Sequence, residues 1–248
     1  MRKRLEILFV LMLFSATAML AQMTTSGING MVTAGGDKAI GATVTAVHEP
    51  SGTTYNTVVN ESGRYSINGM RVGGPYTVKV SYIGYTTSVT KDVTLQLAES
   101  YSLNVKLAED ANELGEVVVS AKATKFTAER TGASTNINLR QLENMPTVSR
   151  SITDFTRLSP YGGNGMSFAG TDGRTANFTV DGANFNNNFG LSDGLPGGGN
   201  PISIDAIEEM QVVISPYDVR QTNFIGGGVN AITKSGTNTF KGTAYIYH

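Results

Sequence analysis

Residues 28–107 alternate apolar and polar side chains with a period of two, and this alternation constrains the fold more than any other feature of the chain. Val78 and Val80 alternate with Thr77 and Lys79, and the same spacing recurs around Ala42 and Leu107. An antiparallel strand with one buried face requires this spacing. Turn residues interrupt it at Gly35-Gly36-Asp37, Pro50-Ser51-Gly52, Glu61-Ser62-Gly63 and Gly73-Gly74-Pro75. The spacing predicts a small β-sandwich over residues 22–108.

The composition favours a mainly β chain and excludes several classes of protein. The 248 residues include 29 glycines and no cysteine, so packing of the sheets, without disulfides, must supply the stability. The 19 basic residues balance 20 acidic ones, and no basic tract follows the N-terminus. This balance argues against a nucleic-acid partner.

The N-terminal residues have the layout of a secretory signal peptide. Residues 1–4 carry the positive charges, residues 5–20 are almost continuously apolar, and the small residue Ala21 follows. This layout predicts a signal peptide over residues 1–21, with residues 16–18 as a second candidate cleavage site. The alternative is a membrane anchor, but the apolar core is short of the ~20 residues that a span needs.

A polar stretch without apolar periodicity follows the predicted sandwich and leads into a run of three valines. We expect residues 109–121 to form a linker that contains this run at residues 116–121. The β-branched run favours an extended backbone, so two interpretations are open. It is either the first strand of the next domain or a strand that a partner protein binds.

Residues 122–236 mix short helical and extended patterns, which predicts an α+β domain. Asn138 can cap a helix with Gln141 three residues later, and Ile152 and Phe155 begin a second apolar stripe. Extended segments are expected at residues 177–180, 211–215 and 229–234. Residues 182–200 between them are rich in Asn and Gly and are too polar to form core.

The last residues, 237–248, alternate again. Phe240, Ala244 and Ile246 alternate with Lys241 and polar or aromatic residues. The pattern is typical of a transmembrane barrel strand with one face toward lipid and one toward the lumen.

Two segments carry a resemblance to a known family: SPYDVRQTNFIGGGVNAITKSGTNTFKG at residues 215–242 and FTVDGANFNNNFG at residues 178–190. They resemble the plug domain of TonB-dependent outer-membrane receptors, most closely the Oar-like and SusC-like group. The sandwich resembles the carboxypeptidase-regulatory-like, transthyretin-type or immunoglobulin-like domain that this group carries, through Gly30-Met31-Val32, Gly41 to Val44, Glu61 to Tyr65 and Tyr76 to Tyr85.

The resemblance implies an N-terminal part of a receptor whose plug gates the energised import of a nutrient, such as a peptide, a glycan or a chelate. The family's barrel has about 22 strands, most of which this chain lacks. The implied location is the outer membrane, with the sandwich in the periplasm. The implied partners are the TonB energy-coupling protein, outer-membrane lipid around the missing barrel, the nutrient itself and, in addition, a surface lipoprotein.

The resemblance also implies two sets of site residues. The coupling segment that TonB would capture by adding it to a sheet edge consists of Glu116, Val117, Val118, Val119 and Ser120. A ligand-facing plug loop would contain Asn184, Asn186, Asn187, Asn188 and Phe189. For this loop the alternative interpretation is a flexible connector.

The residue inventory does not predict an enzyme, a metal site or a cofactor. The chain has no cysteine, and its two histidines are His48 and His248, which form no catalytic zinc cluster. Gly226, Gly228 and Ala231 match a dinucleotide-binding spacing, but strand-like residues follow where a helix should open. Three Asp-Gly pairs lack the spacing of a calcium loop and are better explained as turns.

A different class of function is an exported carbohydrate-binding or adhesive module. Sugar sites usually present exposed aromatic side chains, and this chain has no tryptophan. Four tyrosines of the sandwich could serve instead: Tyr55, Tyr65, Tyr82 and Tyr85.

Overall fold

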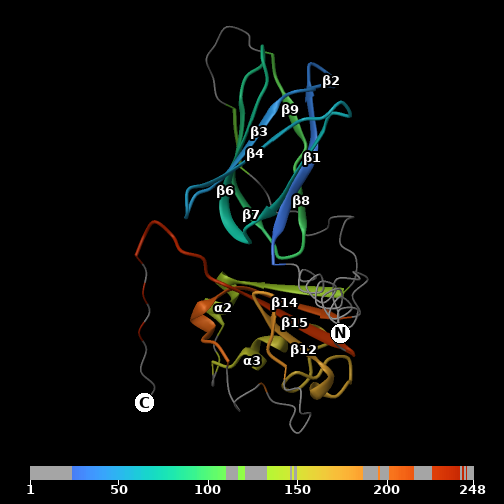
Figure 1. Cartoon of the computed structure of the whole chain (residues 1–248), viewed down its shortest axis with the longest axis vertical. Coiled ribbons are helices and arrows are strands. Elements are labelled where there is room, and N and C mark those ends of the chain that lie inside the picture. The colour runs from blue at the N-terminus through green and yellow to red at the C-terminus, as the bar shows by residue number, and fades with distance from the viewer. Residues whose placement is uncertain are drawn as a thin grey trace, which may run out of the picture.

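The computed structural model describes residues 24–109, 117–120, 133–145, 147, 150–186, 195, 201–214, 225–240, 242 and 244, and for residues 117–120 it describes the backbone alone. The predicted signal peptide lies outside these residues. The described part of the chain is mainly β, as predicted. It forms a two-sheet sandwich and a second, α+β unit, which Figure 1 shows one above the other.

The first sheet of the sandwich is built around one long strand, β1 (Ser26–Ala34). On one side β1 pairs antiparallel with β5 (Arg64–Met70) and with the short β2 (Asp37–Lys38). On its other side it pairs in parallel with β8 (Ser100–Ser102) and β9 (Val105–Leu107). The strand that begins the sandwich sequence therefore lies beside the strands that end it.

The second sheet has the order β10-β7-β6-β3-β4. Its antiparallel strands are β3 (Thr43–His48), β4 (Thr53–Val58), β6 (Gly73–Ser81) and β7 (Ser88–Leu95), and β10 (Val117–Ser120) adds in parallel at one edge. The predicted turn at Gly73-Gly74-Pro75 is wrong, because these residues begin β6. The register between β6 and β7 shifts between Gly73 and Tyr76, which accommodates the proline within the strand.

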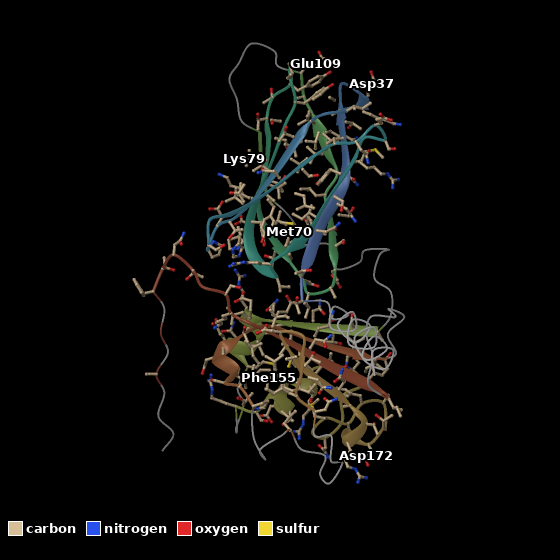
Figure 2. The ribbon with its side chains drawn as sticks, in the orientation of Figure 1. Asp37, Met70, Lys79, Glu109, Phe155 and Asp172 are labelled. Atoms are coloured by element: carbon tan, nitrogen blue, oxygen red, sulfur yellow. The ribbon has the colours of Figure 1, made fainter. Side chains whose placement is uncertain are left out.

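The apolar side chains of the alternating pattern fill the space between the two sheets. Val44 and Ala46 of β3 and Val78 and Val80 of β6 are at most 1% exposed and pack into one apolar cluster with side chains of β1, β5, β7 and β9. Figure 2 labels Met70, a fully buried member of this cluster. Burial of such apolar area is the main favourable term in folding.

One glycine permits the break between β8 and β9. A Cβ atom at Gly30 would lie 1.9 Å from the carbonyl oxygen of Leu103. Leu103 N donates to Asn29 O (2.8 Å), and Tyr65 Oη donates to Leu103 O (2.7 Å). The chain between β8 and β9 therefore passes β1 at close range, and no residue larger than glycine fits at position 30.

The second unit is a five-stranded sheet of order β11-β14-β15-β12-β13. Its strands are β11 (Ala133–Asn138), β12 (Asn177–Val180), β13 (Ala183–Asn184), β14 (Ile207–Ile214) and β15 (Gly227–Thr233). Helices α2 (Leu139–Asn144) and α3 (Ile152–Thr156) and the 3₁₀ turns η2 (Gly173–Thr175) and η4 (Ile204–Ala206) complete it. In Figure 1 the helices lie on the side of the sheet away from the sandwich.

Short sequence signals explain these helices. Asn138 caps α2 in a capping box with Gln141, as the sequence predicted, and Ser151 caps α3 in the same way with Asp154. Phe155, labelled in Figure 2, is 1% exposed and packs into the core beneath the sheet with Ile137 and Met210. Leu158, three residues after Phe155, lies beyond the end of α3 and is 36% exposed.

The turn between β7 and β8 fixes the sandwich to the sheet of the second unit. Leu97 at its centre is fully buried against Val72 and Ile232. Leu97 N donates to Glu209 Oε1 (3.1 Å), and Gln211 Nε2 donates to Leu97 O (3.0 Å). Both polar side chains are 3% exposed, so β14 is buried on two faces, by its own core and by the sandwich.

The residues from 237 onward that the structure describes lie outside helices and strands, and Phe240 is fully exposed. Their assignment to a first barrel strand stays a prediction. None of the helices among the described residues is long and apolar enough to cross a membrane.

Candidate functional site

The predicted coupling segment lies along an edge of the sandwich. Glu116 lies outside the described residues, and Val117, Val118, Val119 and Ser120 form β10. β10 pairs in parallel with β7 in the register Val117↔Ser88 to Ser120↔Lys91. The segment is thus neither a free linker nor a strand of the second unit's sheet. It extends the second sandwich sheet by one strand.

The residues of β7 beside β10 are buried without alternation. Ser88 and Thr90 pair with Val80 and Val78 of β6, which face the sandwich core, whereas Val89 pairs with the exposed Lys79 on the outer face. All three β7 residues are nevertheless at most 9% exposed. The sequence did not single these residues out, because period-two alternation cannot show that a strand is covered on both faces.

The pairing edge of β7 ends at a local distortion. Asp92 has a φ of 61°, in the left-handed region, and the β6–β7 register runs from Val78↔Thr90 to Tyr76↔Val93. Asp is among the few residues other than glycine that tolerate this conformation. The extra residue in β7 turns the backbone away from a regular edge just after Lys91, which pairs with Ser120, the last described residue of β10.

The structure describes the start of the predicted ligand-facing loop but not its later residues. Asn187, Asn188 and Phe189 lie outside the described residues. Asn186 is held within the unit: its Oδ1 accepts from Phe178 N (2.6 Å), its Nδ2 donates to Asn177 Oδ1 (2.8 Å), and its own N donates to Asn184 Oδ1 (2.7 Å). The contacts of Asn186 therefore hold β12 and β13 together.

The remaining polar residues that the sequence raised serve local structure. His48 is 7% exposed, its Nδ1 lies 2.6 Å from Ser51 Oγ, and its ring packs on Tyr76. Burial, assisted by Arg71 and opposed by Glu49, lowers the pKa of His48. Asp181 accepts from Thr233 N (2.9 Å) and Thr233 Oγ1 (2.6 Å), which ties the turn after β12 to the end of β15.

The tyrosines proposed for a sugar site are not gathered on one surface. Tyr65 is 4% exposed with its hydroxyl bonded to Leu103, and Tyr55 packs against Tyr76 inside the sandwich. Tyr82 and Tyr85 stack at a centroid distance of 5.6 Å. Among the described residues no three His, Asp or Glu side chains come together as a metal site.

Three comparisons with known proteins bear on this geometry. A model of the carboxypeptidase regulatory-like domain matches residues 27–108. The TonB-dependent transporter Oar of Myxococcus xanthus is 25% identical over 202 residues, which cover 76% of this chain and 18% of the transporter. The chain thus spans less than a fifth of the length of this relative.

Solved structures give weaker likenesses. A cohesin–X-dockerin complex from Acetivibrio cellulolyticus is 22% identical with a TM-score of 0.28, covering 34% of this chain and 58% of that chain. Catechol 1,2-dioxygenase from Acinetobacter radioresistens is 15% identical with a TM-score of 0.30, covering 40% and 58%. At such scores neither structure bears on function. Residues 27–108 match the model of the carboxypeptidase regulatory-like domain, and the chain as a whole resembles the N-terminal region of a TonB-dependent receptor.

Proposed function

We propose that this chain is the N-terminal part of a TonB-dependent outer-membrane receptor that imports a nutrient, either a peptide, a glycan or a chelate. Residues 22–108 would be a periplasmic sandwich after a signal peptide at residues 1–21. Residues 122–236 would be the plug, and residues 237–248 would begin the barrel. The function is transport, and no residue is assigned a catalytic role.

The observation that carries the proposal is the backbone pairing of Val117–Ser120. These residues add to a sheet edge as a parallel strand. Capture by the TonB protein requires the same behaviour, because the segment contributes main-chain hydrogen bonds to the edge of another sheet. The similarity to the transporter Oar over 76% of the chain supports the same assignment.

The test is Val118→Pro in the full-length receptor. Proline removes a backbone donor from the centre of the segment and resists pairing within a sheet. We expect energised uptake to be lost while the amount of receptor in the outer membrane stays normal. Uptake of the radiolabelled nutrient, with and without the proton motive force, measures the effect.

The matched control is Val118→Thr, which keeps the β-branched shape and the backbone donor. It should transport at close to the wild-type rate. Normal energised uptake by the Val118→Pro receptor would overturn the assignment of residues 116–121 as the coupling segment.

The ligand-facing loop is a second part of the proposal. The contacts of Asn186 support a ligand surface with fewer residues than the sequence predicted, because the side-chain amide of Asn186 already bonds to Phe178 and Asn177. We propose that Asn187, Asn188 and Phe189 contact the nutrient and that Asn186 positions the start of the loop.

A further inference from the structure

The chain leaves the sandwich beside the first residue of the β7 edge. Tyr85 and Glu109 form an isolated antiparallel bridge, and Thr86 N donates to Ala108 O (2.9 Å). Ser88 begins β7 only two positions after Thr86. Figure 2 places Glu109 at the end of the sandwich remote from the second unit, and the bridge to Tyr85 brings it close to the start of β7.

The edge of β7 accepts a strand of limited length. It offers Ser88 to Lys91 for pairing and ends where Asp92 distorts the backbone. In the part of the chain that the structure describes, β10 pairs over the same four positions. A bulge and a charged lysine at the end of an edge are common means of stopping further strand addition.

The core-facing side chains of this edge, unlike Val89 on its outer face, suit a strand that can leave. Ser88 and Thr90 occupy core-facing positions beside β10, whereas Val93 and Leu95 occupy them beyond the bulge, where both belong to the apolar core. Hydroxyl groups can bond to water when the edge is opened, and exposed valine or leucine cannot. The parallel pairing of four residues is also a weaker attachment than a long antiparallel ladder.

We propose that the β7 edge sequesters the coupling segment, so that the TonB protein must displace β10 from the sandwich before it can bind. This proposal rests on the assignment of the coupling segment under the proposed function. It adds that pairing of the segment with β7 and its capture by TonB exclude one another.

Competition has a quantitative consequence. The short connection makes the pairing of β10 with β7 intramolecular, with the high effective concentration of a short linker. If the segment is free in about a tenth of the molecules, the apparent affinity of TonB falls roughly tenfold. Any event that weakens the β10–β7 pairing would raise this affinity without a change at the TonB interface.

The first experiment measures sequestration without TonB. Hydrogen exchange on the whole chain should show the amides of Val117, Val119 and Ser120 exchanging at least about tenfold more slowly than in the Val118→Pro variant, which has no amide N–H at position 118. Equally fast exchange in both proteins would overturn the proposal, since the segment would then be free.

The second experiment locks the pairing. The chain has no cysteine, and Val89 and Val118 are register partners, so Val89→Cys with Val118→Cys should form a disulfide on oxidation. The control pair, Val89→Cys with Ser120→Cys, is two positions out of register and should oxidise more slowly. Failure of the in-register pair to oxidise faster than this control would overturn the pairing.

Binding of the purified periplasmic domain of TonB then tests competition. The oxidised in-register variant should bind at least about tenfold more weakly than the same protein after reduction. Equal binding in both states would overturn the competition. If neither state nor the wild-type chain binds TonB while residues 117–120 stay protected, the proposed coupling function fails and the edge pairing itself stands.

Discussion

The backbone N–H of Leu97 donates a hydrogen bond over 3.1 Å to Oε1 of Glu209, a residue 112 positions away in the sequence. Glu209 is 3% exposed on a strand of the second unit, and Leu97 is fully buried at the tip of a sandwich turn. Gln211 completes the contact by donating to Leu97 O. The two units therefore share a buried polar contact in which both backbone groups of one residue, Leu97, are bonded across the junction.

We predict that Glu209→Ala loosens this junction. It leaves the buried N–H of Leu97 without its acceptor, which costs about 1–3 kcal/mol. Thermal unfolding followed by calorimetry should show a lower transition temperature or a separation into two transitions. Glu209→Gln keeps an oxygen acceptor and should recover part of the loss.

The control for this prediction is Glu143→Ala on helix α2. The Glu143 side chain is 60% exposed and lies 3.9 Å from Lys234 Nζ, so its removal should change stability by less than about 1 kcal/mol. A loss of stability in this control as large as that of Glu209→Ala would show that the buried contact contributes no more to stability than an exposed ion pair.

We predict that Gly30→Ala destabilises the sandwich severely. The added Cβ would lie 1.9 Å from Leu103 O, so the backbone at Leu103, between β8 and β9, must move away from β1. The free energy of unfolding, measured in urea, should fall by about 2 kcal/mol or more. Gly236→Ala, whose added Cβ meets no atom within 4 Å, should stay close to wild type. A Gly30→Ala chain of normal stability would mean that Leu103 O lies farther from position 30 than the structure shows.

We predict that the sandwich loses stability as the pH falls from 7 toward 5, in part through His48. Its pKa is lowered in the folded state, chiefly by burial, so the unfolded chain binds the proton more readily. The contribution is full above the unfolded pKa of about 6.5 and decreases as the pH falls below it. His48→Gln should reduce this dependence in chemical unfolding at a series of pH values. An unchanged slope would show that other groups cause it.

We predict that Asn186→Ala reduces stability whether or not a nutrient is present. The substitution removes the acceptor of Phe178 N and the donor to Asn177 Oδ1, both within a largely buried strand. The expected loss is about 1–3 kcal/mol in thermal or urea unfolding. Asn186→Asp restores the acceptor alone and should be intermediate. Stability equal to wild type, with weaker nutrient uptake, would instead place Asn186 in the ligand surface.

Local signals of the sequence predict the parts of the fold that depend on local physics. The alternation around Val78 and Val80 gives β6, because a half-buried strand needs that spacing. The pair Asn138 and Gln141 gives the start of α2, because a capping box is encoded within four residues.

Contacts between distant residues account for what the sequence does not show. The start of β14 was missed because Glu209 looks like a surface residue, and its burial depends on Leu97 in another unit. The coupling segment was predicted as extended, but its pairing with Ser88 to Lys91 could not be, since parallel partners leave no local signature. The same holds for Asn186, whose role depends on the turn that brings it back to Phe178.

The central place of β1 in its sheet has a consequence for the order of folding. This strand precedes the rest of the sandwich in the chain, yet it obtains its parallel neighbours β8 and β9 only once residue 107 has also reached the compartment in which the domain folds. Until then one side of β1 has unpaired backbone groups, which are a template for association with other chains. A chain that ends before Ser100 should therefore aggregate rather than form a smaller sandwich. The whole domain must be present before the backbone groups of β1 are protected from pairing with another chain.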